Sequence, residues 1–393
     1  MFPKLLPQEL YDLIVDFCRD DVHALRACSL TSQALHHSSR AHIFRSITVD
    51  SMDLFNRFCF LLRELPDVAG LVQELHFNTY HHFMRREPFV WIHHSAAFPA
   101  GTFKGLKVVR FSYVRFDHLS SYPVMPGFYQ QLTNYRGIRE LGISSCDFES
   151  LGALEDFVSR FAPQSEMSFT LSLDCVRWGN PVSAEQIAPS STGLRLSALA
   201  VSNFSRPDII GLRVLSTPSA HTLRTVALKC VIGQELSGVG GFLRNLGNVL
   251  EYLQLGLRFD STPSPIEDVQ DMFDLSRNTN LRSLHLRILD LDYQRMRWVP
   301  ALLQQVAHVP LQYLAFDIWL YSPAQLISPS WDDIAATLSS NPFKTVQDVL
   351  FIHYGALQFT MARTALGYRL PALAERRVLR VRDCSKPLQL PYC

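Results

Sequence analysis

Two segments of the chain contain residue types that could support chemistry, and the first is rich in histidine. His81-His82 and His93-His94 supply imidazoles, which are common zinc ligands. Adjacent histidines point apart on a strand and diverge on a helix, and no cysteine or aspartate completes a set at ligand spacing. We therefore expect a solvated loop here, and we predict no metal site.

The second segment, Gly238-Val239-Gly240-Gly241, is rich in glycine. It matches neither the dinucleotide-binding fingerprint nor a phosphate-binding loop that ends in Gly-Lys-Ser/Thr. It also follows no strand-to-helix turn of the required kind, so we expect a loop. Serine-hydrolase, zinc-protease and kinase motifs are absent from the sequence. The prediction is a protein that is not an enzyme and needs no cofactor, with an enzyme on an α/β sheet as the third possibility.

Composition limits the remaining function classes. Apolar residues make up 47% of the 393 residues and charged residues 19%, which is typical of a globular protein. The net charge is +1, so no nucleic-acid partner is expected. Eight cysteines form no CxxC pair, and no apolar run has signal-peptide or membrane-span length. We expect reduced thiols, no membrane partner, and a cytoplasmic or nuclear protein.

The first 45 residues show a helical pattern. Leu6, Leu10, Leu13, Ile14 and Phe17 fall on one face of a helix. Asp20 and Asp21 can cap a second short helix, and a third is expected after residues 29–32. Three helices of this total length cannot bury enough surface to be stable alone, so their apolar residues must pack against the rest of the chain or another protein.

The run LPQELYDLIVDFCRDDVHALRACSLTSQALHHSSRAHIF resembles an F-box of the kind common in fungi. The resemblance implies that residues 1–45 are a three-helix module that binds the Skp-type adaptor of a cullin ubiquitin ligase. The adaptor-binding residues it implies are Leu6, Pro7, Leu10, Ile14, Leu25, Leu30 and Leu35. Many F-boxes have tryptophan near the position of Leu35, and leucine there would weaken the contact. The alternative is an ordinary amphipathic helical cap.

An apolar-x-x-apolar-x-apolar hexad recurs through the rest of the chain at separations of 27 to 35 residues. It starts at Phe44, Val72, Leu106, Ile138, loosely Ser168, Leu196, Leu223, Leu250, Leu281, Leu311 and Val346. This period resembles that of leucine-rich repeats. The predicted fold is therefore α/β: the F-box, an irregular repeat solenoid with a curved parallel sheet over residues 46–383, and a tail over 384–393. A doubly wound α/β sheet is the alternative.

Amphipathic stretches of helical length lie between the hexads. They are Leu151–Phe161, Ile266–Leu275, Ala301–Val309 and Trp331–Leu338. Ser264 and Ser330 are the predicted N-caps of the second and fourth. Asn or Cys usually follows each hexad of a leucine-rich repeat to bond the turns, and only Cys146 occupies that position cleanly.

The third and fifth hexad residues, and the one after the sixth, should point away from the core. In the carboxyl-terminal hexads these positions mix aromatic and charged side chains, which are enriched at binding hot spots. The predicted substrate-binding residues are Tyr252, Gln254, His285, Arg287, Tyr313 and Asp317.

Together these patterns predict a substrate-recognition subunit of a Skp–cullin–F-box ubiquitin ligase. Its partners would be the Skp-type adaptor, the cullin and RING subunits that this adaptor recruits, and an unknown protein substrate. The alternative is a non-ligase interaction scaffold with a degenerate F-box. An exposed apolar face on the first three helices would favour the ligase subunit, whereas a polar cleft with convergent acid and base groups would favour an enzyme.

Overall fold

The computed structural model describes residues 6–80, 103–116, 137–162, 168–179, 193–203, 205–258, 272–288, 296–327 and 329–384. Within these ranges the chain is an α/β protein built on parallel strands. It divides into two compact units, one comprising residues 1–172 and 176–180, the other residues 173–175 and 181–393. The histidine pairs near positions 81 and 93 lie outside the described residues.

The first unit opens with three helices, α1 (Gln8–Phe17), α2 (Val22–Thr31) and α3 (Gln33–Arg45). Asp21 caps α2 by accepting hydrogen bonds from the backbone N–H groups of His23 (2.9 Å) and Ala24 (3.0 Å). Ser32 caps α3 in the same way. The cap at Asp21 is one of the two that the sequence predicts, and α3 begins after residues 29–32 as expected. Helix α3 ends at Arg45 and the first strand begins at the next residue, so no linker separates the helices from the sheet.

Strands and helices alternate in the rest of the first unit. Its elements are β1 (Ser46–Val49), α4 (Met52–Glu64), α5 (Pro66–Leu71), β2 (Glu74–Asn78), β3 (Val108–Ser112), β4 (Glu140–Ser144), β5 (Asp147–Phe148), α9 (Leu151–Phe161), β6 (Thr170–Asp174) and β7 (Arg177–Trp178). Strands β1, β2, β3, β4 and β6 are neighbours in chain order, while β5 and β7 form a separate two-stranded sheet.

The second unit repeats the same alternation. Its strands are β8 (Ala198–Ser202), β9 (Thr225–Ile232), β10 (Tyr252–Arg258), β11 (Ser283–Ile288), β12 (Tyr313–Trp319), β13 (Asp348–Tyr354) and β14 (Leu379–Asp383). Its α-helices are α10 (Pro207–Leu215), α11 (Leu236–Leu246), α14 (Trp298–Gln305), α15 (Ser330–Ser339), α16 (Phe359–Arg369) and α17 (Pro371–Glu375). Short 3₁₀ helices are η3 (Pro218–His221), η4 (Gly233–Glu235), η5 (Gly247–Val249), η6 (Leu275–Arg277), η7 (Pro323–Ile327) and η8 (Asn341–Thr345).

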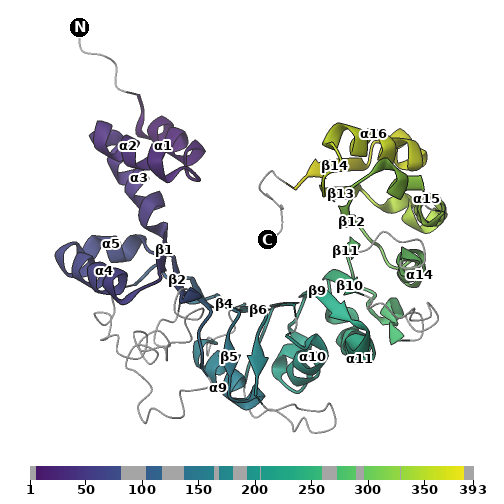
Figure 1. The fold of residues 1–393 in the computed structure, drawn as a ribbon, viewed down its shortest axis with the longest axis horizontal. Coiled ribbons are helices and arrows are strands. Elements are labelled where there is room, and N and C mark those ends of the chain that lie inside the picture. Colours follow the sequence, from purple (N-terminus) through teal and green to yellow (C-terminus); the bar gives the residue numbers. More distant parts are fainter. Residues whose placement is uncertain are drawn as a thin grey trace. The chain divides into compact units, whose positions relative to one another are not determined.

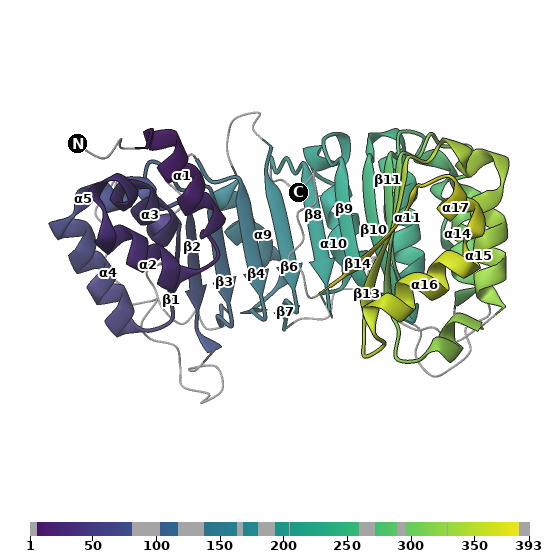
Figure 2. The ribbon, with the colours of Figure 1, turned by 90° about the horizontal axis from the view of Figure 1, so that it is seen from above.

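The seven strands of the second unit pair in parallel, each with the next in the chain. Helices α10, α11, α14 and α15 lie along one side of this sheet (Figures 1 and 2). The apolar hexad residues, such as Leu253, Leu255 and Leu284, point to that side and are fully buried. We call the opposite side, which carries the third and fifth hexad residues, the open face.

Each predicted hexad contains a strand that begins at its third residue, from Ser46 in the hexad of Phe44 to Asp348 in the hexad of Val346. Burial alternates as expected, because successive side chains of a strand point to opposite faces. Strand β14 has no predicted hexad, and it extends the sheet beyond the last one.

The helix predictions are confirmed in part. Helix α9 has the predicted bounds, α15 extends one residue further at each end, and α14 begins three residues before the predicted start at Ala301. The prediction that Ser330 caps α15 is wrong, because Ser330 lies inside the helix, fully buried, and Pro329 precedes it. The predicted cap at Ser264 and residues 266–271 of its helix lie outside the described residues.

The prediction of a loop at residues 238–241 is also wrong, because these residues lie inside α11. A Cβ on Gly240 would lie 1.8 Å from the carbonyl oxygen of Met272, and one on Gly238 would lie 2.7 Å from the Asp208 side chain. Gly240 lets the backbone of Met272 approach the helix closely, and Gly238 leaves room for the Asp208 side chain. Tertiary packing therefore outweighs the low helix propensity of glycine.

The turns that follow four consecutive hexads share one backbone feature. Tyr113, Ser145, Cys175 and Asn203 each occupy the eighth position and have positive φ angles of 63°, 51°, 52° and 40°. Next to Ser145, the buried Cys146 thiol lies 3.2 Å from the Ser144 carbonyl oxygen and accepts from the Val114 N–H. Cys146 therefore bonds the turns together, as its position in the sequence predicts.

Candidate protein-interaction surfaces

Polar side chains form the seam between α1 and α3. The Gln8 amide donates to the Ala34 carbonyl oxygen (2.8 Å), and four residues further along both helices the Ser38 hydroxyl donates to Asp12. After another four residues, His42 Nε2 lies 2.8 Å from Asp16 Oδ1. The hydrogen bonds from Ser38 and Gln8 lower the pKa of Asp12. Because this seam is polar, α1 does not use its apolar face to contact α3.

Most large apolar side chains of α1 are exposed, as are Val22 and Leu30 of α2, whereas Val15 and Leu25 are buried. Phe17 is 84% and Leu30 is 87% exposed, and the other exposed apolar residues of this region are about half exposed. We call the following residues the exposed apolar set: Leu6, Leu10, Leu13, Ile14, Phe17, Val22 and Leu30. Large apolar side chains gathered on so small a module are typical of a surface that another molecule covers.

The predicted adaptor-binding residues separate into two groups. Leu6, Leu10, Ile14 and Leu30 belong to the exposed apolar set, and Pro7 is exposed beside them as the N-cap of α1. Leu35 is half-buried, and Leu25 is only 1% exposed. Leu25 therefore supports the three helices from inside, and its side chain cannot contact a partner directly.

In the first unit, the strand residues on the side away from α9 bind one another. Arg110 forms ion pairs with Glu74 (3.0 Å) and Glu140 (2.7 Å) on the two neighbouring strands. Beside it, His76 Nε2 lies 2.8 Å from the Ser112 hydroxyl, and desolvation followed by the charge of Arg110 lowers the pKa of His76. The polar groups of these strand residues therefore form ion pairs and hydrogen bonds with one another.

The open face of the second unit brings the predicted substrate-binding residues onto three adjacent strands. Tyr252 on β10 and Tyr313 on β12 lie in one row across the sheet, with Ser283 of β11 between them. In the next row Gln254 lies beside His285. The sequence prediction therefore selects residues that the fold places together.

Asp317 organises the third row of this face. It is 3% exposed, and its two oxygens accept from His285 Nε2 (2.8 Å) and Arg287 Nε (2.9 Å). The Arg287 guanidinium also donates to the Lys229 carbonyl oxygen and lies 5.5 Å from the centre of the Trp319 ring. This network fixes the orientation of His285 and Arg287, since both partners share one buried carboxylate.

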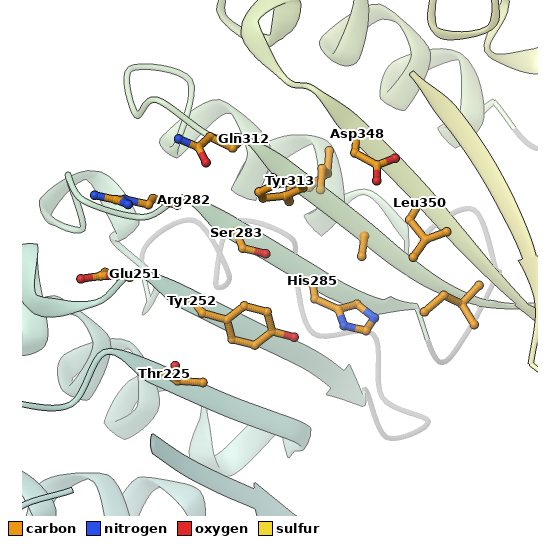
Figure 3. Close-up of a pocket in the computed structure, with 13 residues that line it drawn as sticks. Thr225, Glu251, Tyr252, Arg282, Ser283, His285, Gln312, Tyr313, Asp348 and Leu350 are labelled. Atoms are coloured by element: carbon orange, nitrogen blue, oxygen red, sulfur yellow. The ribbon is translucent and has the colours of Figure 1, made fainter. Parts of the chain in front are cut away.

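A pocket of about 400 Å³ lies on the open face (Figure 3). Its lining residues are Thr225, Glu251, Tyr252, Arg282, Ser283, His285, Gln312, Tyr313, Leu314, Ala315, Asp348, Leu350 and Ile352. Of the predicted substrate-binding residues, Tyr252, His285 and Tyr313 line it, whereas Gln254, Arg287 and Asp317 are not among the lining residues. Volumes near this size are typical of small binding sites.

The sequence prediction of the site missed Asp348, Leu350 and the stacked pair Trp319–Tyr354, whose ring centres are 4.6 Å apart. Asp348 and Leu350 are the third and fifth residues of the Val346 hexad, so the same rule would have found them. Trp319 and Tyr354 follow their hexads at the ends of β12 and β13, where no periodic signal singles them out.

The pocket also contains part of an acid–base arrangement. His285 and Asp317 form a pair of the kind that orients a catalytic histidine. However, Asp317 is shared with the Arg287 cation, and no hydrogen bond joins Ser283 to His285 in the described structure. Asp317 therefore holds His285 and Arg287 in fixed orientations.

The described part of the chain contains no disulfide, no metal-binding cluster and no membrane-spanning helix. The cysteines described there are free thiols, and no group of three or more His, Cys, Asp or Glu side chains is placed to hold a metal ion. None of the described helices combines the length and apolarity needed to span a membrane.

No protein-family model matches this chain, and comparison with curated proteins gives no match. Inferences about function therefore start from the residues and the geometry described above.

Proposed function

We propose that this chain is the substrate-recognition subunit of a Skp–cullin–F-box type ubiquitin ligase. Residues 1–45 would be the F-box that binds a Skp-type adaptor, and residues 46–383 a leucine-rich-repeat-like domain that binds a protein substrate. The chain would act in the cytoplasm or nucleus, without catalysis of its own. The observation that carries this proposal is the exposed apolar set on α1 and α2.

The exposed apolar set is energetically costly unless a partner covers it. Full burial of one Leu, Ile or Phe side chain contributes roughly 1.5–3 kcal/mol. Several such side chains remain in solvent here, while side-chain hydrogen bonds join α1 to α3. A helix-binding partner would recover that free energy, and this is the role that the F-box resemblance assigns to the same residues.

The regular sequence of parallel strands supports the repeat domain. One strand occurs per hexad, each paired with the next, and Cys146 bonds successive turns in the way expected of a leucine-rich repeat. A recognition subunit acts by raising the effective concentration of its substrate beside the transfer machinery and by orienting it. The direct continuation of α3 into β1 suits this task, since a flexible linker there would weaken orientation.

Co-purification with a Skp-type adaptor tests the proposal. We expect the full chain to form a stable complex and the double variant Leu10→Asp, Ile14→Asp to lose it, because two exposed apolar contacts become charges. The matched control is Met361→Asp, Tyr368→Asp, which places the same charges on exposed apolar positions of α16 in the other unit. The control should bind normally.

Failure of the folded original chain to bind the adaptor would contradict the proposal. The alternative function, a non-ligase interaction scaffold with a degenerate F-box, would then account for the open face. The half-buried Leu35, where many F-boxes carry tryptophan, is the residue that favours this alternative.

A further inference from the structure

The charged residues that line the pocket of the second unit are mainly acidic. Glu251 and Asp348 contribute carboxylates, and Arg282 contributes the one full positive charge among the lining residues that the structure describes. Arg282 is exposed at the rim and extends on the side of Glu251, away from Asp348 (Figure 3). The interior near Asp348 therefore has a negative charge with no lining cation beside it.

Both carboxylates have ion-pair partners, and those partners lie outside the pocket lining. Glu251 pairs with Arg224 at 3.0 Å and Asp348 pairs with Arg380 at 3.3 Å, and both arginines are about 70% exposed. In each pair the negative end lines the pocket and the positive end lies in solvent. Such solvent-exposed arginines neutralise a carboxylate only weakly.

Asp348 is the less satisfied of the two carboxylates. Its side chain is 22% exposed, and its buried Oδ1 atom lies 3.3 Å from Arg380 Nε in an ion pair that lacks hydrogen-bond geometry. Desolvation raises the pKa of Asp348, and the charge of Arg380 offsets this only in part. A hydrogen-bond donor with a positive charge, placed in the pocket, would compensate this desolvation.

The rest of the lining is suited to an apolar side chain. The small residues Ser283 and Ala315 leave space between larger neighbours: Ser283 lies between the two tyrosines, and Ala315 lies between His285 and Leu350. Ile352 continues the aliphatic wall along β13. An extended peptide laid across the strands would find an apolar hollow next to a carboxylate.

We propose that this pocket binds a peptide segment of a partner protein through an apolar side chain seated over Ala315 and a neighbouring lysine or arginine that pairs with Asp348. Under the proposed function this segment belongs to the substrate, so the inference adds the chemical class of the recognised sequence. An acidic segment that pairs with Arg282 is the main competing occupant, and the test below separates the two.

The test uses the full-length chain and a randomised heptapeptide display library. Peptides enriched on the original chain should carry an aliphatic or aromatic residue next to Lys or Arg. A synthetic peptide of that consensus should bind Asp348→Asn roughly tenfold more weakly, because a charge-assisted hydrogen bond is lost. Ala315→Leu, which fills the hollow, should weaken binding similarly. Arg282→Gln removes a cation from the lining and should not weaken binding of a basic peptide. Arg57→Gln, an exposed arginine of α4 in the other unit, should leave binding unchanged.

Enrichment of acidic peptides, or a loss of affinity in Arg282→Gln but not in Asp348→Asn, would overturn the inference. So would the absence of any enriched peptide. Asp348→Asn is nearly isosteric, so it keeps the test valid even where Ala315→Leu disturbs packing. Adaptor binding is measured separately. The pocket variants should bind the adaptor as the original chain does. If the proposed function is wrong, the original chain itself should not bind the adaptor.

Discussion

Gly240 illustrates how much a single residue decides in this fold. Its position in α11 brings the backbone of Met272 so close that a Cβ would lie 1.8 Å from the carbonyl oxygen. The neighbouring Gly241 has open space, with nothing within 4 Å of a Cβ. The two glycines therefore have different roles although they are adjacent in the sequence.

Gly240→Ala should lower the free energy of unfolding by about 3 kcal/mol or more, because a backbone clash cannot be relieved by rotating a side chain. The matched variant Gly241→Ala should be neutral or stabilise the helix by up to about 1 kcal/mol. Denaturant unfolding of both variants checks this. Equal effects of the two substitutions would show that close packing is not the reason for glycine at position 240.

Cys146 provides a pH-dependent test at the same scale. Burial raises the pKa of its thiol from 9.0 to about 12. The folded chain therefore holds this proton more tightly than the unfolded chain does, and stability from the neutral thiol is present below pH 9 and is lost as the pH rises toward 12. We expect Cys146→Ala to be less stable than the original at pH 7, and the difference to shrink at pH 10.5. A difference that stays constant in unfolding experiments across this range would contradict the assignment.

At the scale of elements, the three amino-terminal helices carry both buried and exposed apolar side chains. Leu25 is buried among the helices, whereas Leu30, five residues later on the same helix α2, is 87% exposed. The F-box resemblance assigns both to adaptor binding, and burial distinguishes them.

Leu25→Ala should destabilise the three helices by about 2–5 kcal/mol, because it leaves a cavity. Leu30→Ala should change stability by less than about 0.5 kcal/mol and weaken adaptor binding roughly tenfold. Amide hydrogen exchange of residues 8–45 and adaptor titration measure the two effects. A loss of stability in Leu30→Ala would mean that this side chain packs within the module.

Sequence patterns predict these elements to different extents. The strands follow from the hexads because in–out alternation is a local property, and the predicted cap at Asp21 is local as well. The helix over residues 238–241 could not be predicted from the sequence. Glycine is needed at position 240 because the backbone of Met272, distant in the sequence, packs against it. The pocket likewise depends on the small residues Ser283 and Ala315, which come together only when two separate hexads pair in register.

At the scale of the whole molecule, two kinds of surface are available for partners. The exposed apolar set lies on the first unit, and the pocketed open face lies on the second. A subunit that connects an adaptor to a substrate needs two such surfaces, so that occupation of one leaves the other accessible. The account therefore requires that the adaptor bind only the amino-terminal helices.

Amide hydrogen exchange of the full chain, with and without a purified Skp-type adaptor, tests this requirement most directly. The account predicts slower exchange in α1 and α2, residues 8–31, with no change in β11–β13 around the pocket. No slowing in α1 and α2 at saturating adaptor, or slowing confined to the strands of the open face, would contradict the assignment of the exposed apolar set as the adaptor-binding surface.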